Sequence, residues 1–286
     1  MSNAAYSLDL PQKRTTSVVF ASPHSGRDYS DVFLNQTVLD KKTIRSSEDA
    51  FVDKLFVAAP RFGAPLLRAG APRAFVDLNR SADELDPALI EGVGKVSHNP
   101  RVASGLGVIP RVVANGRAIY RGKMSWQRAQ DRITHIWHPY HARLQQLLTE
   151  NHNQFGEAIL IDCHSMPHEA IESIAKSAVK KPQIVLGDRF GAAANSDVMD
   201  RVEQAFTKVG LNVVRNTPFA GAYIAQTYGR PSRRQHVIQI EIDRALYMDE
   251  KTILPRRDFE TFRKLITGAI ADITQIGQVK LPMAAE

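Results

Sequence analysis

The sequence contains a single cysteine, Cys163, and this excludes both an internal disulfide and a zinc site built from thiolates. Such scarcity of cysteine is typical of a reducing compartment. No apolar run approaches the roughly 18 consecutive residues of a membrane helix. Residues 1–16 also lack the basic start and apolar core of a signal peptide. We therefore expect a cytoplasmic protein that has no membrane partner.

Clusters of basic residues interleaved with aromatic side chains are missing as well. The chain has 37 Lys and Arg against 30 Asp and Glu, a formal net charge of +7, but the basic residues are dispersed along it. Proteins that bind nucleic acid concentrate such charge on one face or stripe. We therefore expect no nucleic-acid partner, and we interpret the modest positive charge as an attraction for a small anionic substrate.

The chain does contain enough apolar material for a sizeable core, since 43% of its 286 residues are hydrophobic and 23% are charged. This length and composition predict one large domain or one domain with insertions. We expect a tail over residues 1–16 and a single catalytic α/β domain over residues 17–280. Residues 81–122 are rich in glycine, proline and polar residues without periodicity, which predicts a loop-rich insertion of the kind that often covers an active site.

Apolar runs that fit strands alternate along the chain with amphipathic segments that fit helices. The alternation predicts a three-layer α/β fold, and the fully apolar Ile159-Leu160-Ile161 fits a strand covered on both faces. Pro139 is a point of interruption in the longest helical segment. The expected strands are 17–25 with its turn, 158–162, 183–186, 211–215 and 237–242, and the expected helices are 50–59, 123–151, 198–209 and 258–276.

Three of the apolar runs end abruptly at residues that bind metals or transfer protons. His24 follows one run, His164 follows a second, and Glu241 follows a third. In open α/β sheets, ligands bind outside the carboxyl ends of the strands. Two imidazoles and a carboxylate at matching strand ends therefore indicate a catalytic metal with its base. For any one such histidine, a hydrogen-bonded turn residue is the ordinary alternative.

A catalytic zinc site usually has three protein ligands drawn from histidines and carboxylates, plus an open position for water. His24 and His164 are the first two candidates. Asp49 and Glu48 compete for the third position, because both lie at the first turn of a predicted helix, where either can equally serve as a cap. Asp162 lies two residues before His164 on the same face of an extended chain, where it can orient the imidazole.

Glu241 is the candidate general base, since a carboxylate beside a metal can take a proton from water. Gln239, Glu241 and Asp243 alternate with three isoleucines, so one strand face carries three polar side chains. A solvated strand face is the alternative explanation of this pattern. The apolar residues that follow Arg244 favour an internal strand, in which a carboxylate needs a polar partner.

Arginine side chains are the candidates for binding a substrate carboxylate, because a guanidinium makes a planar two-pronged contact with it. Asn79-Arg80 ends a further apolar run, and Arg80 is the first candidate, against the alternative of an ordinary surface arginine. Tyr223 is a further substrate-binding candidate, since it lies in a glycine-hinged loop before a predicted strand. Weaker candidates for binding the carboxylate, or for stabilising an oxyanion, are Arg121, Arg189 and Arg230. Of these, Arg121 is the candidate for the catalytic role, and Arg189 and Arg230 are candidates for substrate binding.

Three further histidines are explained by packing rather than chemistry. His135, His138 and His141 step by three residues, a spacing that drifts around a helix, and aromatic residues stand beside them. We therefore interpret them as partly buried packing residues and expect no metal at this segment.

Five motifs, in order along residues 17–250, carry a family resemblance. They are Ser22-Pro23-His24-Ser25-Gly26, Glu48-Asp49-Ala50-Phe51-Val52-Asp53-Lys54-Leu55-Phe56, Val76-Asp77-Leu78-Asn79-Arg80, Asp162-Cys163-His164-Ser165, and Gln239-Ile240-Glu241-Ile242-Asp243-Arg244 with the residues up to Glu250. Together they extend over most of the chain. They resemble the motifs of the N-formylglutamate amidohydrolase family and stand in that family's order.

The resemblance implies a fold and a ligand set. The family is similar in architecture to the zinc carboxypeptidases and to succinylglutamate desuccinylase, which implies a phosphorylase/hydrolase-like α/β fold with a mixed central sheet. It implies that His24 and His164 are metal ligands, that Glu241 is the base, and that Asn79 with Arg80 grips the substrate carboxylate. In the relatives a Glu stands three residues after the first His. Here that position is Arg27, so Asp49 or Glu48 must replace the missing ligand.

The activity implied is zinc-dependent hydrolysis of the linear amide bond of N-formyl-L-glutamate to formate and L-glutamate, a reaction of histidine degradation. One Zn²⁺ is expected to polarise the formyl carbonyl and to lower the pKa of its water toward roughly 7, while Glu241 moves the proton and Arg80 holds the anionic glutamate portion. Another N-acyl-amino-acid deacylase, a carboxypeptidase on the same scaffold, and a non-catalytic metal or anion binder stay open. We expect a monomer or a small homo-oligomer.

Overall fold

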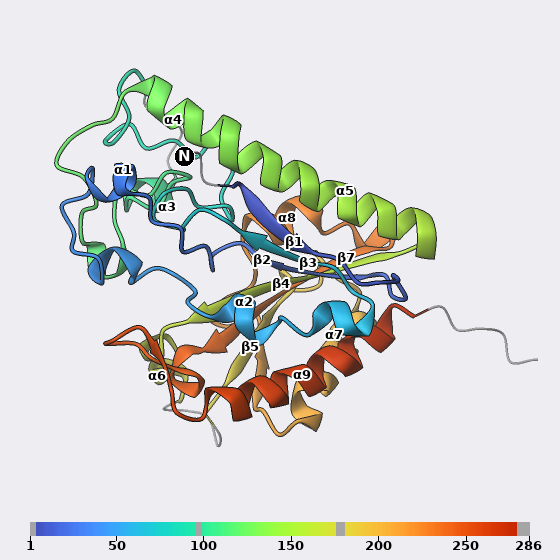
Figure 1. Ribbon diagram of the computed structural model, residues 1–286. Coiled ribbons are helices and arrows are strands. Elements are labelled where there is room, and N and C mark those ends of the chain that lie inside the picture. The colour runs from blue at the N-terminus through green and yellow to red at the C-terminus, as the bar shows by residue number, and fades with distance from the viewer. Residues whose placement is uncertain (1–3, 95–98, 176–180, 279–286) are drawn as a thin grey trace, which may run out of the picture.

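A mixed sheet of seven strands forms the centre of the computed structural model, which describes residues 4–94, 99–175 and 181–278 (Figure 1). The strand order is β1-β3-β2-β4-β7-β5-β6. The inner strands β3, β2, β4 and β7 run parallel, whereas β1 is antiparallel to β3 and β5 is antiparallel to β7. The bounds are β1 Tyr6–Asp9, β2 Val18–Ser22, β3 Leu66–Ala69, β4 Ala158–Met166, β5 Ile184–Gly187, β6 Val213–Arg215 and β7 Gln235–Asp243.

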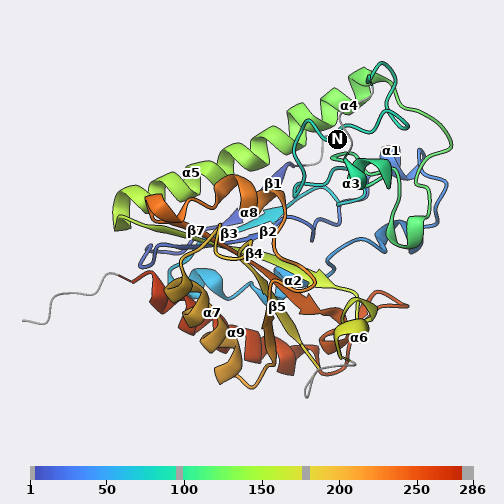
Figure 2. The ribbon, with the colours of Figure 1, turned by 180° about the vertical axis from the view of Figure 1, so that it is seen from behind.

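Helices cover both faces of this sheet (Figures 1 and 2). The long helix α5 and the short α8 pack on one face, and α2, α7 and α9 pack on the other. This confirms the predicted three-layer α/β fold with a mixed central sheet. The helices are α1 Asp31–Leu34, α2 Val52–Leu55, α3 Pro100–Ala103, α4 Trp126–Arg132, α5 His138–Phe155, α6 Glu169–Ala175, α7 Ser196–Lys208, α8 Tyr223–Tyr228 and α9 Phe259–Ile276. Short 3-10 turns lie at Thr43–Arg45, Ala59–Phe62, Ala114–Gly116, Pro231–Arg233 and Arg244–Leu246, and β8 Met248–Asp249 pairs with β9 Leu254–Pro255.

The alternation of side chains along β4 and β7 decides which residues meet at the site. In β4, Ile159 and Ile161 pack into the core under α7 and α9, whereas Leu160 packs under α5. Because successive strand residues point to opposite faces, Asp162 and His164 point to the α5 face. The isoleucines of β7 pack with α7 and α9, so Glu241 also points to the α5 face.

The carboxyl ends of β2, β4 and β7 meet at one edge of the sheet, as predicted. These strands are parallel neighbours, and their register pairs Phe20 with Ile161 and His164 with Glu241. His24 follows β2 by two residues. His164 lies inside β4 rather than after it, because that strand continues to Met166, four residues beyond its expected end.

The predicted helix over 50–59 is wrong in its extent. Only Val52–Leu55 is α-helical, and a separate 3-10 turn follows at Ala59–Phe62. Phe51, at the N-cap, has a φ of 66°, so the chain enters the helix from a left-handed residue. Glu48 and Asp49 therefore lie in the loop before the helix and not in its first turn.

The interruption predicted at Pro139 is confirmed as a π-helical turn. Residues Ile133–Trp137 are π-helical and join α4 to α5, and the N–H of His138 donates to the carbonyl of Ile133, five residues earlier. Proline has no N–H to donate and crowds the preceding turn, which disfavours an unbroken α-helix at this point.

The first residues of the chain correct the expected tail over 1–16. Tyr6–Asp9 form β1 and pair along β3, and Arg68 donates to Asp9 at 2.8 Å. The expected insertion 81–122 is largely irregular, with α3 and one 3-10 turn, and several of its side chains, including Ile90 and Ile109, are buried in the core under α5. Of the ranges predicted from sequence, residues 1–3, 95–98, 176–180, 279 and 280 lie outside the described part. Across the residues that are described, no helix is both long and apolar enough to cross a membrane.

Candidate metal centre

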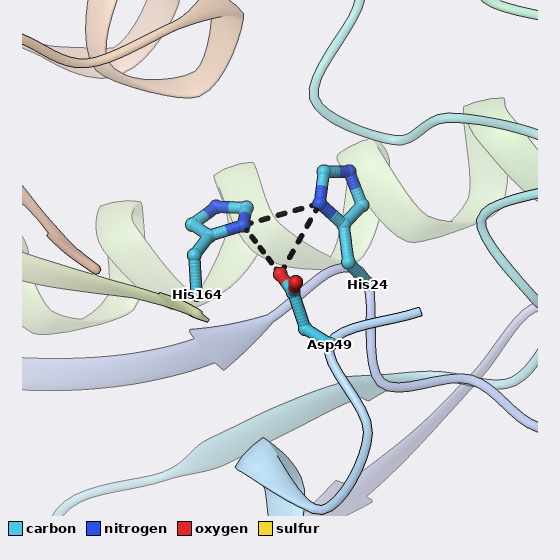
Figure 3. A group of neighbouring side chains, drawn as sticks. All are labelled: His24, Asp49 and His164. Atoms are coloured by element: carbon cyan, nitrogen blue, oxygen red, sulfur yellow. Dashed lines mark hydrogen bonds and ion pairs between the residues drawn. The ribbon is translucent and has the colours of Figure 1, made fainter. Parts of the chain in front are cut away.

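Two imidazoles and one carboxylate converge at the carboxyl edge of the sheet. His24 Nδ1 and His164 Nδ1 are 3.1 Å apart, and Asp49 Oδ2 lies 3.1 Å from the latter and 3.5 Å from the former. Figure 3 shows the two rings and the carboxylate pointing at one another from three separate segments. All three residues are buried. The three atoms could therefore hold one metal ion.

The spacing of these atoms fits a small divalent cation. Zinc binds imidazole nitrogen and carboxylate oxygen at about 2.0–2.2 Å, and tetrahedral ligands at such distances are about 3.3 Å apart. The three observed separations, 3.1, 3.1 and 3.5 Å, bracket that value. Two histidines and a carboxylate are also a known ligand set of catalytic zinc sites.

A carboxylate stands behind each imidazole. Asp77 Oδ1 lies 2.7 Å from His24 Nε2, and Asp162 Oδ2 lies 3.1 Å from His164 Nε2. Metal-binding histidines characteristically direct their second nitrogen at such a group, which holds the proton there and leaves the first nitrogen to the metal. The Asp162 carboxylate is fully buried, and His164 is its ion-pair contact rather than an aligned hydrogen-bond partner. The contact predicted between Asp162 and His164 is present.

Asp49 is held as an anion. Its Oδ1 accepts hydrogen bonds from Arg244 at 3.0 Å and from Ser165 at 3.1 Å, which leaves Oδ2 for the two imidazoles. Burial opposes the charge, but hydrogen bonds to His164 and His24 keep the pKa of Asp49 well below its usual value. The backbone N–H of Asp49 also donates to the carbonyl of His24 at 3.0 Å, which joins the two segments.

Glu48 points elsewhere. Arg45 donates to both of its oxygens, at 2.8 and 3.1 Å, and the Tyr29 hydroxyl donates to Oε2 at 3.1 Å. Of the two carboxylates that the sequence leaves open, the structure therefore brings Asp49 to the histidines and commits Glu48 to an ion pair.

Glu241 lies on the strand next to His164. It is 8% exposed, and Gln239 Nε2 donates to its Oε1 at 2.9 Å. Burial raises the pKa of the Glu241 carboxyl to about 7, against the opposing charge of His164. A carboxyl that titrates near neutral pH can both accept and return a proton, as a general base must.

Comparison with known proteins identifies the family of the chain that carries this arrangement. A model of the N-formylglutamate amidohydrolase family matches residues 16–248. The chain belongs to this family.

Relatives of known structure or name agree with the family assignment. The crystal structure of N-formylglutamate amidohydrolase from Ralstonia eutropha JMP134 is 34% identical in sequence and superposes with a TM-score of 0.88, over 96% of this chain and 98% of that one. The N-formylglutamate deformylases of Pseudomonas aeruginosa and Pseudomonas putida are 26% and 27% identical over 238 and 236 residues. These matches cover 82% of this chain in both cases, and 83% and 82% of the relatives.

Asn79 lies beside His164, and Arg80 is the next residue along the chain. Asn79 Nδ2 is 3.2 Å from His164 Nε2. Arg80 is buried, and its guanidinium donates to two backbone carbonyls, those of Leu106 and Asn79, each at 3.0 Å. No carboxylate among the described residues forms an ion pair with it. Arg80 is therefore a buried cation without an anionic partner in the described part of the protein.

The other predicted substrate-binding residues lie at different distances from the buried group. Tyr223 begins α8 and packs against Trp137 at a ring distance of 5.9 Å, close to Asn79 through its neighbour Ile224. Arg189, half-buried and with a φ of 57°, lies against the loop that contains Gly221.

Arg121 and Arg230 are not brought into the buried group. Arg121 is exposed. Arg230 is bridged to Gln235, which starts β7 at the amino end, and its guanidinium donates to the carbonyl of Gln226. Glu241 is six positions further along the strand than Gln235, about 20 Å at the rise of an extended chain. The prediction that Arg230 binds substrate at this edge is not supported by its position.

Two residues near the site, Arg73 and Asp77, are not evident as site residues from the sequence. Arg73 Nε donates to Asp77 Oδ2 at 3.0 Å, and its positive charge opposes the rise in the pKa of Glu241. Its remaining guanidinium donors have no hydrogen-bond partner among the described residues, and the side chain is 26% exposed. Asp77 stands two residues before Asn79 in the motif that ends at Arg80, and this proximity is the available signal.

Proposed function

We propose that this protein is a metal-dependent amidohydrolase that cleaves N-formyl-L-glutamate to formate and L-glutamate. One observation carries the proposal: two imidazoles and a carboxylate with atoms 3.1–3.5 Å apart stand beside a buried Glu241 of raised pKa. Membership of the N-formylglutamate amidohydrolase family supports the substrate, since the named relatives are deformylases of that compound.

Zn²⁺ is the metal that this ligand set favours, and His24, Asp49 and His164 would hold it. When bound, a divalent ion of this kind polarises a carbonyl oxygen and lowers the pKa of water to about 7. Asp77 and Asp162 keep the two imidazoles oriented for such a role. Arg244 neutralises the second oxygen of Asp49 and so fixes which oxygen faces the histidines.

Glu241 performs the proton transfers. It takes a proton from the attacking water as the oxygen adds to the formyl carbon. It then gives the proton to the nitrogen as the carbon–nitrogen bond breaks, so that the water supplies the hydroxyl of formic acid and the hydrogen of the amine. Gln239 fixes one oxygen of Glu241 and leaves the other for the water.

Arg80 and Asn79 bind the anionic part of the substrate. A substrate carboxylate supplies the partner that the buried Arg80 guanidinium lacks, and this pairing converts binding energy into orientation of the formyl group. Tyr223 is a further contact, because it begins the helix whose backbone N–H, at Ile224, binds Asn79.

Arg73 is the arginine we assign to the developing oxyanion. One edge of its guanidinium is fixed on Asp77, and the donors on its other edge have no hydrogen-bond partner among the described residues, so they are available to a carbonyl oxygen. Burial works against its charge, but Asp77 and Asp49 raise the pKa of Arg73, so the cation is retained. Arg121, the arginine expected from sequence for this step, is exposed instead.

The test combines metal analysis with a substrate panel. We expect about one divalent ion per chain by elemental analysis, formate release from N-formyl-L-glutamate, loss of activity on chelation, and recovery with Zn²⁺. The panel adds N-acetyl- and N-succinyl-L-glutamate and N-formyl-L-aspartate, and N-formyl-L-glutamate should give the highest kcat/KM. A preference for a larger acyl group would indicate another deacylase, and full activity in metal-free protein would contradict the metal assignment.

A further inference from the structure

Two ring N–H groups on one helix hold the backbone on either side of Asn79. Trp137 Nε1 donates to the carbonyl of Arg80 at 2.9 Å. His141 Nε2 lies 2.9 Å from the carbonyl oxygen of Leu78. Because a carbonyl oxygen only accepts, the proton of the imidazole must be on Nε2. The carbonyls of the residues before and after Asn79 are thus both bound by side chains from the layer above the sheet.

The spacing of the two donors follows from the helix. Trp137 and His141 are four residues apart, so they lie on the same helix face. Trp137 is the last residue of the π-helical turn, and His141 lies in the first turn of α5. Both are buried, and their rings are in contact at a centroid distance of 4.0 Å, tilted by 33°. A π-helical turn often marks a functional segment, and here it ends at Trp137, which binds the backbone of the irregular segment 78–80.

Tyr228 fixes the tautomer that His141 needs. Its hydroxyl lies 2.8 Å from His141 Nδ1, which accepts because the proton is on the other nitrogen. Burial lowers the pKa of His141 to about 4, so the ring is neutral at neutral pH. Tyr228 lies in α8, the helix whose first turn binds Asn79, and its ring is parallel to that of His141.

The held backbone determines where two substrate-binding side chains lie. Asn79 Oδ1 accepts from the backbone N–H of Ile224 at 2.8 Å, and its Nδ2 lies 3.4 Å from Gln239 Oε1. The Arg80 guanidinium donates to the carbonyl of Asn79 itself. A shift of the segment would therefore move the amide and the guanidinium together.

We propose that Trp137 and His141 are positioning residues for substrate binding, which hold the Leu78–Arg80 backbone so that Asn79 and Arg80 meet the substrate carboxylate. The proposal rests on the proposed function, since it names the two residues that position Asn79 and Arg80 for binding the substrate carboxylate. Neither side chain touches the reacting atoms. Their effect is on the binding of the anion, and the chemical step at Glu241 is separate from it.

The first test is Trp137→Phe, with Trp126→Phe as the matched control. Trp126 starts α4 on the same helical segment and is 45% exposed, so the same chemical change there breaks no contact to residues 78–80. We expect Trp137→Phe to raise KM for N-formyl-L-glutamate about tenfold, the order of one lost hydrogen bond, with kcat within about threefold. The control should match the unaltered protein in both constants.

A double-mutant cycle separates positioning from general stability. In an Arg80→Lys background the carboxylate contact is already impaired, so Trp137→Phe should raise KM there by less than about threefold. An equal rise in both backgrounds, or a fall confined to kcat, would overturn the proposal. It would also be overturned if Trp126→Phe had the same effect as Trp137→Phe.

Amide hydrogen exchange tests, without any substrate, whether Trp137 and His141 restrain the Leu78–Arg80 backbone. Peptides spanning residues 74–82 should exchange faster in Trp137→Phe and in Tyr228→Phe, but not in Trp126→Phe. Tyr228→Phe removes only the hydroxyl that fixes His141, so it serves if Trp137→Phe does not fold. Unchanged exchange in Tyr228→Phe and in any folded Trp137→Phe would show that these side chains do not restrain the backbone of residues 78–80. If the unaltered protein releases no formate, the proposed function fails, and the exchange result still decides whether the segment is held.

Discussion

His164 and Glu241 are direct partners in the sheet, paired in register between the parallel strands β4 and β7. Neighbouring strands lie about 4.8 Å apart, so the separation of a metal-ligand candidate and the proposed base is set by backbone hydrogen bonds. Both side chains are buried, and both point to the α5 face. A site built on strands keeps its geometry better than one built on loops, and this pairing is the rigid part of the proposed centre.

Glu241→Gln should abolish most turnover while leaving the metal in place. The amide has nearly the same size but cannot accept the proton of the attacking water, so we expect kcat to fall about 10²- to 10⁴-fold. Steady-state kinetics with formate detection measures the loss, and elemental analysis should show unchanged metal. Retention of more than about a tenth of the activity would remove Glu241 from the role of base.

Asp77→Asn should weaken metal binding although Asp77 is not expected to touch the metal. The carboxylate holds His24 Nε2 at 2.7 Å, and loss of such a partner typically costs about 10- to 100-fold in metal affinity. Competition with a chromophoric chelator measures the change. Glu48→Gln is the matched control, because that carboxylate is also buried but belongs to the ion pair with Arg45. Equal affinity in the two variants would contradict the assignment of Asp77.

The residues that sequence places correctly are those fixed by strands. His24, His164 and Glu241 follow apolar runs, and the rule that parallel strands end at one edge is enough to bring them together. Asp49 and Glu48 are adjacent in a loop, and no periodicity tells them apart. Their separation depends on contacts distant in sequence, such as the one between Arg244 and Asp49.

The arginines show the same limit. Arg80 is a candidate because it lies in a motif, and it is buried next to Asn79. Arg230 is a candidate only through its glycine-rich surroundings, and it lies at the amino end of β7. Arg73 has no motif of its own in the sequence. Its position follows from the ion pair with Asp77, which only the folded chain shows. The strand β1 likewise escapes prediction, because four residues at an edge, Tyr6–Asp9, carry too short a pattern to distinguish them from a tail.

Arg73→Gln should lower kcat more than it raises KM. If the guanidinium stabilises charge that develops on the carbonyl oxygen, its loss costs about 10²-fold in kcat, the usual effect of removing one such donor. Arg121→Gln removes the same charge at an exposed position and should stay within about twofold of the unaltered protein. Equal kcat in the two variants would show that Arg73 does not contribute to the transition state.

Stability should depend on pH through His141. The pKa of this buried imidazole is lowered to about 4 from an ordinary value of 6.5, so the unfolded chain binds the proton more readily. The stabilisation that the neutral His141 gives to the folded protein is therefore complete above pH 6.5, and it is lost progressively as the pH falls toward about 4. Between pH 7 and pH 5 this loss amounts to about 2 kcal/mol of unfolding free energy.

The variant His141→Gln tests this dependence, because it keeps an amide donor for the Leu78 carbonyl but does not titrate. Urea unfolding of both proteins at the two pH values measures the difference, and carboxylates that titrate in both cancel. The unaltered protein should lose about 2 kcal/mol more than the variant over this interval, whereas equal losses would mean that His141 is not held neutral.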